Sequence, residues 1–344
     1  MSAQQSIKPK DPRITVMGCR YVERGEAAMR FSRFAKSIAS LPAKEMGFNW
    51  QKGQTTTGVR IGFETDSASV KLRFRVQEGE VNRGSQFGVF VNGEWFKSYD
   101  FKPKDGVDCS FSVGDGGAGL RQFEVVLPSL SNPQLLGIEI DEGASFRGVE
   151  KPKSVYVACG DSITHGVGQG SASYQTYGYL LAKMLGYDYY NLAVGGGKVS
   201  IPVARQLGDW ERIDVITHLV GYNDWCFEGK SPAQYTEAYR GWLAELRKHH
   251  PEAEVYCIGM TYTKNTQSKK TDYKTDAYRE GLEKLVAELR EGGDQHLHYV
   301  AGERISSEKN LREDRVEDPV HFGIKGAALF AKALYPIVSG SGKQ

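Results

Sequence analysis

The pattern of hydrophobic and polar positions changes near residue 150. Between residues 58 and 146, short segments alternate apolar with polar side chains and are separated by Gly, Asn, Asp and Ser: VRIGFET, SVKLRFRV, QFGVFVNGEWF, RQFEVVL and LLGIEI. Alternation with a period of two is typical of strands with one buried face, and the Asn-Gly pair in VNGEW predicts a tight hairpin. This part is predicted to be an antiparallel β-sandwich. The stretch EAAMRFSRFAKSIASL, within residues 24–49, is expected to be helical.

After residues 151–153, nearly continuous apolar runs alternate with amphipathic segments of helical length. Strands are predicted at residues 155–160, 187–194, 214–221, 254–260 and 296–300, and helices at residues 176–186, 231–250, 275–291 and 323–338. This alternation predicts a parallel sheet with helices on both faces and with functional groups at the carboxyl ends of its strands. The expected fold class is α/β, with a β-sandwich domain over residues 1–152 and a domain with the parallel sheet over residues 153–344.

Composition and charge exclude several classes of partner. The 44 basic and 42 acidic residues are intermixed and give a net charge of +2, so no sequence-wide field favours nucleic acid or an anionic membrane. The five cysteines form no CxxC pair and no Cys/His cluster with zinc spacing, so neither a metal site nor a disulfide framework is expected. The chain has no long apolar span, and its N-terminus, MSAQQSIKPKDPR, lacks the apolar core of a signal peptide. We therefore expect a soluble protein without a membrane partner, and the sequence predicts no oligomeric state.

The stretch VACGDSITHG places Ser162 directly after a predicted strand. Ser162 is either a nucleophile or a turn residue, because Gly, Asp and Ser are also common in turns. The GxSxG elbow of α/β-hydrolases is absent, since Thr164 stands where the second glycine would be. His165 belongs to the same turn and is expected to line the site or to cap a helix rather than to act as a base.

Three other segments carry groups that a nucleophilic serine needs. DPVHFG, just before the last predicted helix, offers Asp318 and His321 as an orienting carboxylate and a base three residues apart. NLAVGGGK offers the backbone amides of residues 195–197 as donors to an oxyanion, and LVGYNDW offers the side-chain amide of Asn223. Each segment alone is an ordinary loop.

Together and in this order, the four segments resemble the SGNH, or GDSL-type, hydrolase superfamily. The resemblance covers about residues 153–338 and implies a three-layer α/β/α fold that hydrolyses esters through an acyl-serine, without a cofactor. It implies that Ser162 is the nucleophile, His321 the base and Asp318 its orienting acid. It also implies an oxyanion hole made by the amides of Ser162 and Gly196 and the side chain of Asn223, with Gly195 and Gly197 as alternatives to Gly196.

The order of the two domains also resembles carbohydrate esterase family two, whose members remove acetyl groups from plant polysaccharides. This implies an acetylated carbohydrate as substrate and a secreted or periplasmic location, although the chain shows no signal peptide and a cytoplasmic location stays open. Four residues close to the motifs are candidate substrate contacts: Asp161, Tyr222, Trp225 and Tyr262. Tyr222 stands where the superfamily commonly has threonine. The polar loop at residues 264–270 is expected to be solvated.

Other functions remain open from the sequence. A lipolytic or thioester hydrolase would use the same residues with a longer acyl pocket. A glycan-binding protein with a vestigial site is the non-enzymatic alternative, and an enzyme that modifies acetyl groups of a cell wall or exopolysaccharide would share the chemistry. A nucleotide-binding loop is disfavoured, because Leu192 and Val199 replace the first glycine and the Ser/Thr of the P-loop pattern around Lys198.

Overall fold

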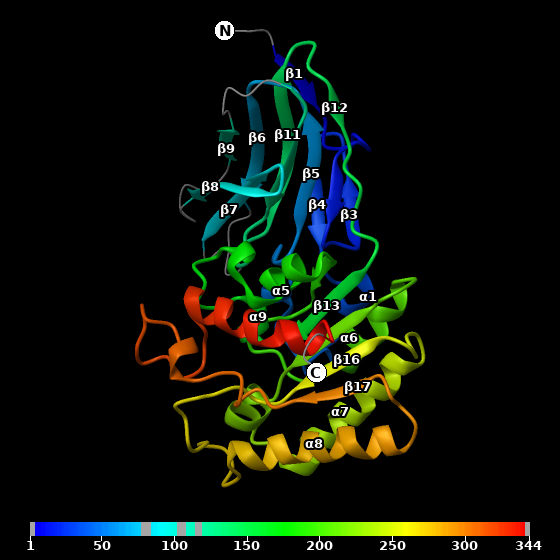
Figure 1. The fold of residues 1–344 in the computed structure, drawn as a ribbon, viewed down its shortest axis with the longest axis vertical. Coiled ribbons are helices and arrows are strands. Elements are labelled where there is room, and N and C mark those ends of the chain that lie inside the picture. The colour runs from blue at the N-terminus through cyan, green and yellow to red at the C-terminus, as the bar shows by residue number, and fades with distance from the viewer. Residues whose placement is uncertain (1–3, 77–83, 102–107, 114–118, 341–344) are drawn as a thin grey trace. The chain divides into compact units, whose positions relative to one another are not determined.

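A computed structural model describes residues 4–76, 84–101, 108–113 and 119–340, which form two compact units (Figure 1). The first unit comprises Met1–Arg33, Gln54–Pro152 and Gly170–Tyr174, and the second comprises Phe34–Gly53, Lys153–Gln169 and Gln175–Gln344. The main junction thus lies between Pro152 and Lys153, but residues 34–53 belong to the second unit and residues 170–174 to the first.

The first unit consists of two antiparallel sheets. The strands of one sheet are β1 (Gln4–Ile7), β3 (Tyr21–Arg24), β4 (Met29–Ser32), β6 (Val70–Val76), β9 (Asp108–Val113) and β11 (Pro133–Asp141). The strands of the other are β2 (Thr15–Met17), β5 (Arg60–Thr65), β7 (Ser85–Val91), β8 (Glu94–Phe101), β10 (Arg121–Val126) and β12 (Phe146–Arg147). Their orders are β3-β4-β11-β6-β9, with β1 beside β11, and β12-β5-β10-β7-β8, with β2 beside β5.

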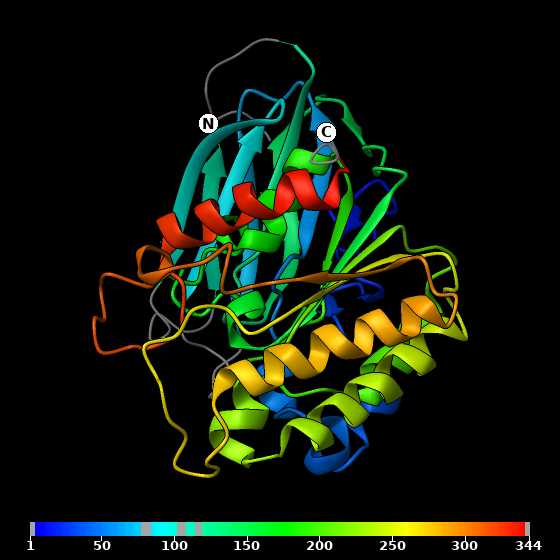
Figure 2. The same ribbon diagram turned by 60° about the horizontal axis from the view of Figure 1, so that its bottom comes forward.

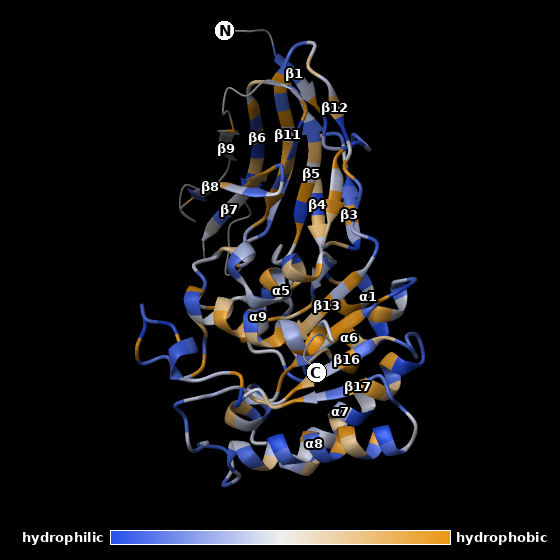
Figure 3. Ribbon diagram, viewed as in Figure 1, coloured by the Kyte–Doolittle hydropathy of each residue, from blue (hydrophilic) through white to orange (hydrophobic). Residues whose placement is uncertain are grey.

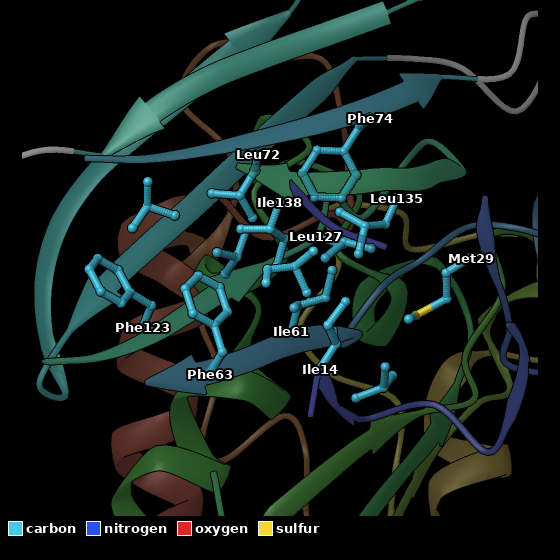
Figure 4. Close-up of a cluster of buried hydrophobic side chains, with 14 of the residues drawn as sticks. Ile14, Met29, Ile61, Phe63, Leu72, Phe74, Phe123, Leu127, Leu135 and Ile138 are labelled. Carbon is cyan, nitrogen blue, oxygen red and sulfur yellow. The ribbon is translucent and has the colours of Figure 1, made fainter. Parts of the chain in front are cut away.

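Apolar side chains from the two sheets form the core of this unit (Figure 4). Phe63 of β5 stacks on Phe123 of β10 with ring centroids 5.2 Å apart, and both rings are buried. The predicted hairpin connects β7 to β8, where Asn92 and Gly93 both have positive φ (52° and 82°), as a type I′ turn requires. The predicted β-sandwich is confirmed.

The predicted helix within residues 24–49 is wrong in its first part. Met29 and Phe31 are buried while Arg30 is exposed, so this segment has the period of a strand and forms β4. Only single helical turns follow it: α1 (Lys36–Ala39), α2 (Ala43–Met46) and α3 (Trp50–Gly53).

The second unit contains a parallel sheet in the order β14-β13-β15-β16-β17. Its strands are β13 (Val155–Gly160), β14 (Asp188–Asn191), β15 (Val215–Leu219), β16 (Glu254–Ile258) and β17 (Leu297–Val300). The longer helices are α5 (Tyr177–Leu185), α6 (Ile201–Gln206), α7 (Pro232–Arg247), α8 (Thr275–Glu291) and α9 (Ile324–Val338), and α4 (Ser162–His165) is a single turn. Shorter helical turns of this unit are η3 (Leu207–Asp209), η4 (Asp224–Glu228) and η5 (Glu308–Asn310), whereas η2 (Ser173–Gln175) begins in the first unit and ends in the second.

Helices cover both faces of this sheet. Helices α8 (gold) and α9 (red) lie on opposite sides of its strands (Figure 2), and α9 packs with α5 while α7 packs with α6 and α8. The central strands β13 and β16 are largely hydrophobic (Figure 3), as expected for strands buried on two faces. The α/β fold class predicted from the sequence is confirmed, and within the described residues no helix is long and apolar enough to cross a membrane.

Candidate active site

Ser162 lies at the carboxyl end of β13, where it begins helix α4. Asp161 is the N-cap of this helix, and its Oδ1 accepts a hydrogen bond from the amide of Ile163 at 3.0 Å. The amide of Ser162 has no intrahelical acceptor, because the first amides of a helix precede its hydrogen-bonding ladder. Both the hydroxyl and the amide of Ser162 are therefore available at this edge of the sheet.

His321 connects Ser162 to Asp318. Its Nε2 lies 2.8 Å from the Oγ of Ser162, and its Nδ1 lies 2.9 and 2.8 Å from the two carboxylate oxygens of Asp318. Since a carboxylate can only accept, Nδ1 carries the proton and Nε2 presents its lone pair to the serine hydroxyl. This tautomer allows His321 to take a proton from Ser162.

Asp318 is held as an anion by the turn that also carries His321. Its Oδ1 accepts the backbone amides of Val320 at 3.2 Å and His321 at 3.1 Å. Burial alone would raise the pKa of Asp318, but the amide of His321, its imidazole and the amide of Val320 lower that pKa below its usual value. Arg312, 3.6 Å away, adds a positive charge. The carboxylate is thus ionised at neutral pH and can stabilise an imidazolium.

The glycine-rich loop after β14 presents one free amide. The amide of Gly195 donates to Nδ1 of His165 at 3.0 Å, and the amide of Gly197 donates to the carbonyl of Val194 at 2.8 Å. The amide of Gly196 has no hydrogen-bond partner among the described residues, and Gly196 has a φ of +81°, which favours glycine. Of the three alternatives, Gly196 is therefore the amide left for an oxyanion.

Asn223 holds this loop and faces the same space. Its Nδ2 donates to the carbonyl of Gly197 at 2.8 Å, which uses one of its two N–H groups. Asn223 is 5% exposed and lines the pocket that contains Ser162 and His321. Its second N–H can therefore serve as a donor in the pocket.

The pocket beside Ser162 has a volume of about 600 Å³. Its wall combines the apolar surfaces of Tyr222, Phe227 and Val320 with polar and charged side chains. Besides the four candidate catalytic residues, six polar or charged residues line the pocket: Asn265, Gln267, Lys269, Lys270, Arg315 and Glu317. Such a wall can contact the apolar parts of a ligand and hydrogen-bond to its polar groups.

Three of the four candidate substrate contacts lie elsewhere than expected. Asp161 is 1% exposed and caps α4, and burial raises its pKa to about 7. Trp225 is fully buried, with its indole nitrogen donating to the carbonyl of Tyr273 at 2.8 Å, so it supports Tyr222 from behind. Tyr262 is partly buried and does not line the pocket. Of the four candidate contacts, only Tyr222 lines the pocket.

Residues missed from the sequence come from loops whose path the motifs do not reveal. The loop at residues 264–270, expected to be solvated, contributes Asn265, Gln267 and two lysines to the pocket wall. Phe227, from the π-helical turn η4, is 63% exposed at the pocket. Lys52 of α3 reaches the glycine-rich loop, its Nζ lying 4.0 Å from where a Cβ on Gly196 would be. A helical turn far upstream in sequence carries no signal that would have predicted this.

Comparison with known families agrees with the four sequence segments that carry Ser162, the glycine-rich loop, Asn223 and His321. Residues 158–329 match the model of the GDSL-like lipase/acylhydrolase family, which confirms the resemblance seen in the sequence. No curated protein matches the chain by sequence.

Solved structures share the fold of the chain over nearly its whole length. The salicylyl-acyltransferase SsfX3 from a tetracycline biosynthetic pathway is 24% identical with a TM-score of 0.85, covering 99% of this chain and 98% of that one. A protein from Bacteroides ovatus named as a GDSL-like lipase is 20% identical with a TM-score of 0.77, at the same coverage. A family two carbohydrate esterase from Cellvibrio japonicus is 16% identical with a TM-score of 0.69, again covering 99% and 98%.

Proposed function

Because the chain belongs to the GDSL-like lipase/acylhydrolase family, we propose that it is a serine esterase that removes O-acetyl groups from a carbohydrate through an acyl-serine intermediate. The observation that carries this proposal is the hydrogen-bonded series Ser162–His321–Asp318 at the wall of a pocket that both apolar and polar side chains line. An intact series of this kind supports an active enzyme over a vestigial site.

In the first half of the reaction, the Oγ of Ser162 attacks the acetyl carbonyl carbon while Nε2 of His321 takes the serine proton. The carboxylate of Asp318 stabilises the imidazolium that forms. The carbonyl oxygen becomes an oxyanion, which the amides of Ser162 and Gly196 and the side chain of Asn223 bind. Collapse of this intermediate breaks the bond to the sugar oxygen, which receives the proton from His321 and leaves as an alcohol.

In the second half, His321 takes a proton from water, and the resulting hydroxide attacks the acyl-serine. The same donors bind the second oxyanion. The Oγ of Ser162 then leaves, recovers the proton from His321, and acetate is released. Every proton transfer uses one nitrogen of one imidazole, so the chain's own residues supply both the base and the acid.

A carbohydrate as the leaving group is supported by the pocket wall. Amide side chains of Asn265 and Gln267 offer both donors and acceptors, which match sugar hydroxyls, and Tyr222 offers an apolar ring surface. The structural likeness to a family two carbohydrate esterase is consistent with this substrate class.

Acyl transfer to an alcohol is a second candidate function. An acyl-serine reacts with a bound hydroxyl as it does with water, and one protein of similar fold is named as a salicylyl-acyltransferase. Tyr222 and Phe227, whose ring centroids lie 6.3 Å apart, give the pocket aromatic walls for a planar acyl group.

The test is acetate release from a panel of acetylated xylan, mannan, pectin and bacterial glycans by the wild type and by Ser162→Ala. We expect release from at least one glycan by the wild type and none above background by the variant. Release from no glycan, together with faster turnover of 4-nitrophenyl benzoate than of the acetate ester, would favour the acyltransferase. Faster turnover of the octanoate ester would favour a lipolytic enzyme.

A further inference from the structure

The β-sandwich unit carries an aromatic cluster with one exposed ring, which the esterase chemistry does not use. Trp95, at the start of β8, is 48% exposed. Its ring lies 4.7 Å from that of Tyr174 at an interplanar angle of 31°, and 5.3 Å from that of Phe90 at 74°. We propose that this cluster, formed by Phe90, Trp95 and Tyr174, is a binding site for a pyranose ring of a neutral polysaccharide.

The local backbone turns Trp95 to the outside of the sheet. β7 and β8 pair with Phe87 opposite Tyr99 and Val89 opposite Lys97, but an irregularity after Val89 then places Phe90 opposite Trp95. Such a β-bulge re-aims side chains. As a result Phe96 packs against the core of the unit while Trp95 stays exposed.

Tyr174 packs beneath the exposed ring of Trp95 and is itself held in place by its neighbours. It lies across Gly88 of β7, where a Cβ would be only 2.4 Å from Cδ1 of the tyrosine ring, so Gly88 makes the space that Tyr174 fills. Tyr174 is 7% exposed, and its hydroxyl donates to Oε1 of Gln86 at 2.6 Å. Trp95 therefore rests on a fixed support, which lowers the entropy that is lost when a ligand stacks on it.

Polar groups lie on the same face as the aromatic rings. Gln86, Gly88 and Phe90 alternate along β7 and face Asp100, Ser98 and Trp95 of β8. Nε2 of Gln86 donates to Oδ1 of Asp100 at 2.7 Å, which leaves the other oxygen of this exposed carboxylate to accept from a ligand. The ring of Trp95, with the carboxylate of Asp100 and the hydroxyl of Ser98 on the same face, matches a pyranose, which has apolar C–H faces and hydroxyl groups around its edge.

The size and charge of the cluster favour a sugar over other occupants. The exposed part of Trp95 amounts to on the order of 100 Å², whereas a stable protein interface needs about 800 Å² from each partner. The exposed carboxylate of Asp100 lies on the face of the sheet that carries Trp95, which disfavours an anionic lipid surface. Neither the small exposed area nor the negative charge disfavours a neutral polysaccharide.

The test is native affinity electrophoresis of the full chain in gels containing unsubstituted xylan, glucomannan or mixed-linkage β-glucan, with Ser162→Ala as the background. This variant keeps the cluster and removes turnover, so the result does not depend on the proposed function. We expect at least one polysaccharide to retard the protein, and Trp95→Ala to weaken that binding about tenfold or more. Leu120→Ala, which removes a side chain of the same unit with 47% exposure, should bind like its parent.

Because Trp95 belongs to the β-sandwich unit and not to the Ser162–His321–Asp318 series, its removal should leave the hydrolysis of 4-nitrophenyl acetate by the otherwise unmodified chain unchanged, with at most a modest fall in the unfolding temperature. Gly88→Ala gives an independent check, since its new methyl group displaces Tyr174 while Trp95 remains, and it should also weaken binding. The proposal is overturned if none of the three polysaccharides retards the parent. It is also overturned if Trp95→Ala is retarded as strongly, which would place binding elsewhere, or if Trp95 instead supports a dimer in sedimentation velocity.

Discussion

The Nδ1 of His165 accepts the backbone amide of Gly195 at 3.0 Å. His165 is 2% exposed and lies on the same helical turn as Ser162, so this bond ties the glycine-rich loop to the turn that carries the nucleophile. It also orients the next peptide, whose amide belongs to Gly196. We therefore interpret His165 as a residue that positions the oxyanion hole and does not touch the reacting atoms.

His165→Ala is expected to lower kcat for 4-nitrophenyl acetate about 10- to 100-fold with little change in KM, because the Gly196 amide loses its alignment. His165→Asn is the matched control, since its side-chain oxygen takes the place of Nδ1 and can accept the Gly195 amide. Steady-state kinetics of the two variants decide the matter. Equal losses in both, or a loss confined to KM, would contradict a positioning role.

Asn223→Ala is expected to lower kcat about 10²- to 10³-fold, as the loss of one oxyanion donor does in other acyl-transfer enzymes. Asn265→Ala removes an amide of the same pocket whose Nδ2 donates to the hydroxyl of Tyr222, and it should act mainly on KM. Initial-rate measurements over a range of acetate-ester concentrations separate the two effects. A kcat loss as large for Asn265→Ala would argue against a special role of Asn223.

Asp318→Asn is expected to lower kcat by about 10³- to 10⁴-fold, because an amide no longer fixes the tautomer of His321 or stabilises its imidazolium. Glu313→Gln is the control: this exposed acid lies in the same segment and pairs only loosely with Lys325, at 3.6 Å. The readout is turnover of 4-nitrophenyl acetate at neutral pH. Retention of more than a tenth of the activity by Asp318→Asn would be inconsistent with its role.

The raised pKa of Asp161 predicts that the stability of the folded chain decreases with rising pH. Burial raises its pKa from 3.8 to about 7 in the folded chain, and the nearby carboxylate of Asp224 raises it further. The folded state thus holds its proton where the unfolded state has lost it, so the free energy of unfolding falls as pH rises from about 4 to 7. Above pH 7 the full cost, at most about 4 kcal/mol, is present.

Asp161→Asn keeps an oxygen that can cap α4 but cannot ionise. We expect it to be more stable than the wild type at pH 8 and equally stable near pH 4, as measured by urea unfolding at both values. Asp161→Ala removes the cap as well and should be less stable than Asp161→Asn at both values, by about 1 kcal/mol. An Asp161→Asn variant that is less stable than the wild type at pH 8 would contradict the raised pKa.

The sequence could bring the residues of the candidate site together because most of them follow strand ends. The parallel strands are read from apolar runs, and their carboxyl ends meet at one edge, so Ser162, the 195–197 loop and Asn223 converge without further information. Asp318 and His321 meet through a local turn three residues long. Gly196 could be separated from its neighbours only in the structure, where the partners of the Gly195 and Gly197 amides are known.

Elements that depend on tertiary contacts were harder to predict. The segment at residues 29–32 has the alternation of a strand, but helix-forming residues follow it directly. Four positions are too few to distinguish the two-residue period of a strand from the 3.6-residue period of a helix. Around Asn223, the π-helical turn η4 buries Trp225 and exposes Phe227, and the side on which each aromatic falls is not encoded in their spacing. The loop at residues 264–270 reaches the pocket along a path that only the fold defines.

The central claim is that Ser162 forms a covalent acyl intermediate whose formation and breakdown both need His321. Intact-protein mass spectrometry after rapid acid quenching of a reaction with 4-nitrophenyl acetate tests it most directly, with peptide mapping to locate the adduct. We expect a transient mass increase of one acetyl group on Ser162 in the wild type and none on this residue in Ser162→Ala. Turnover without an acetylated Ser162, or an acetyl group that forms on another residue and decays at the rate of turnover, would contradict the account.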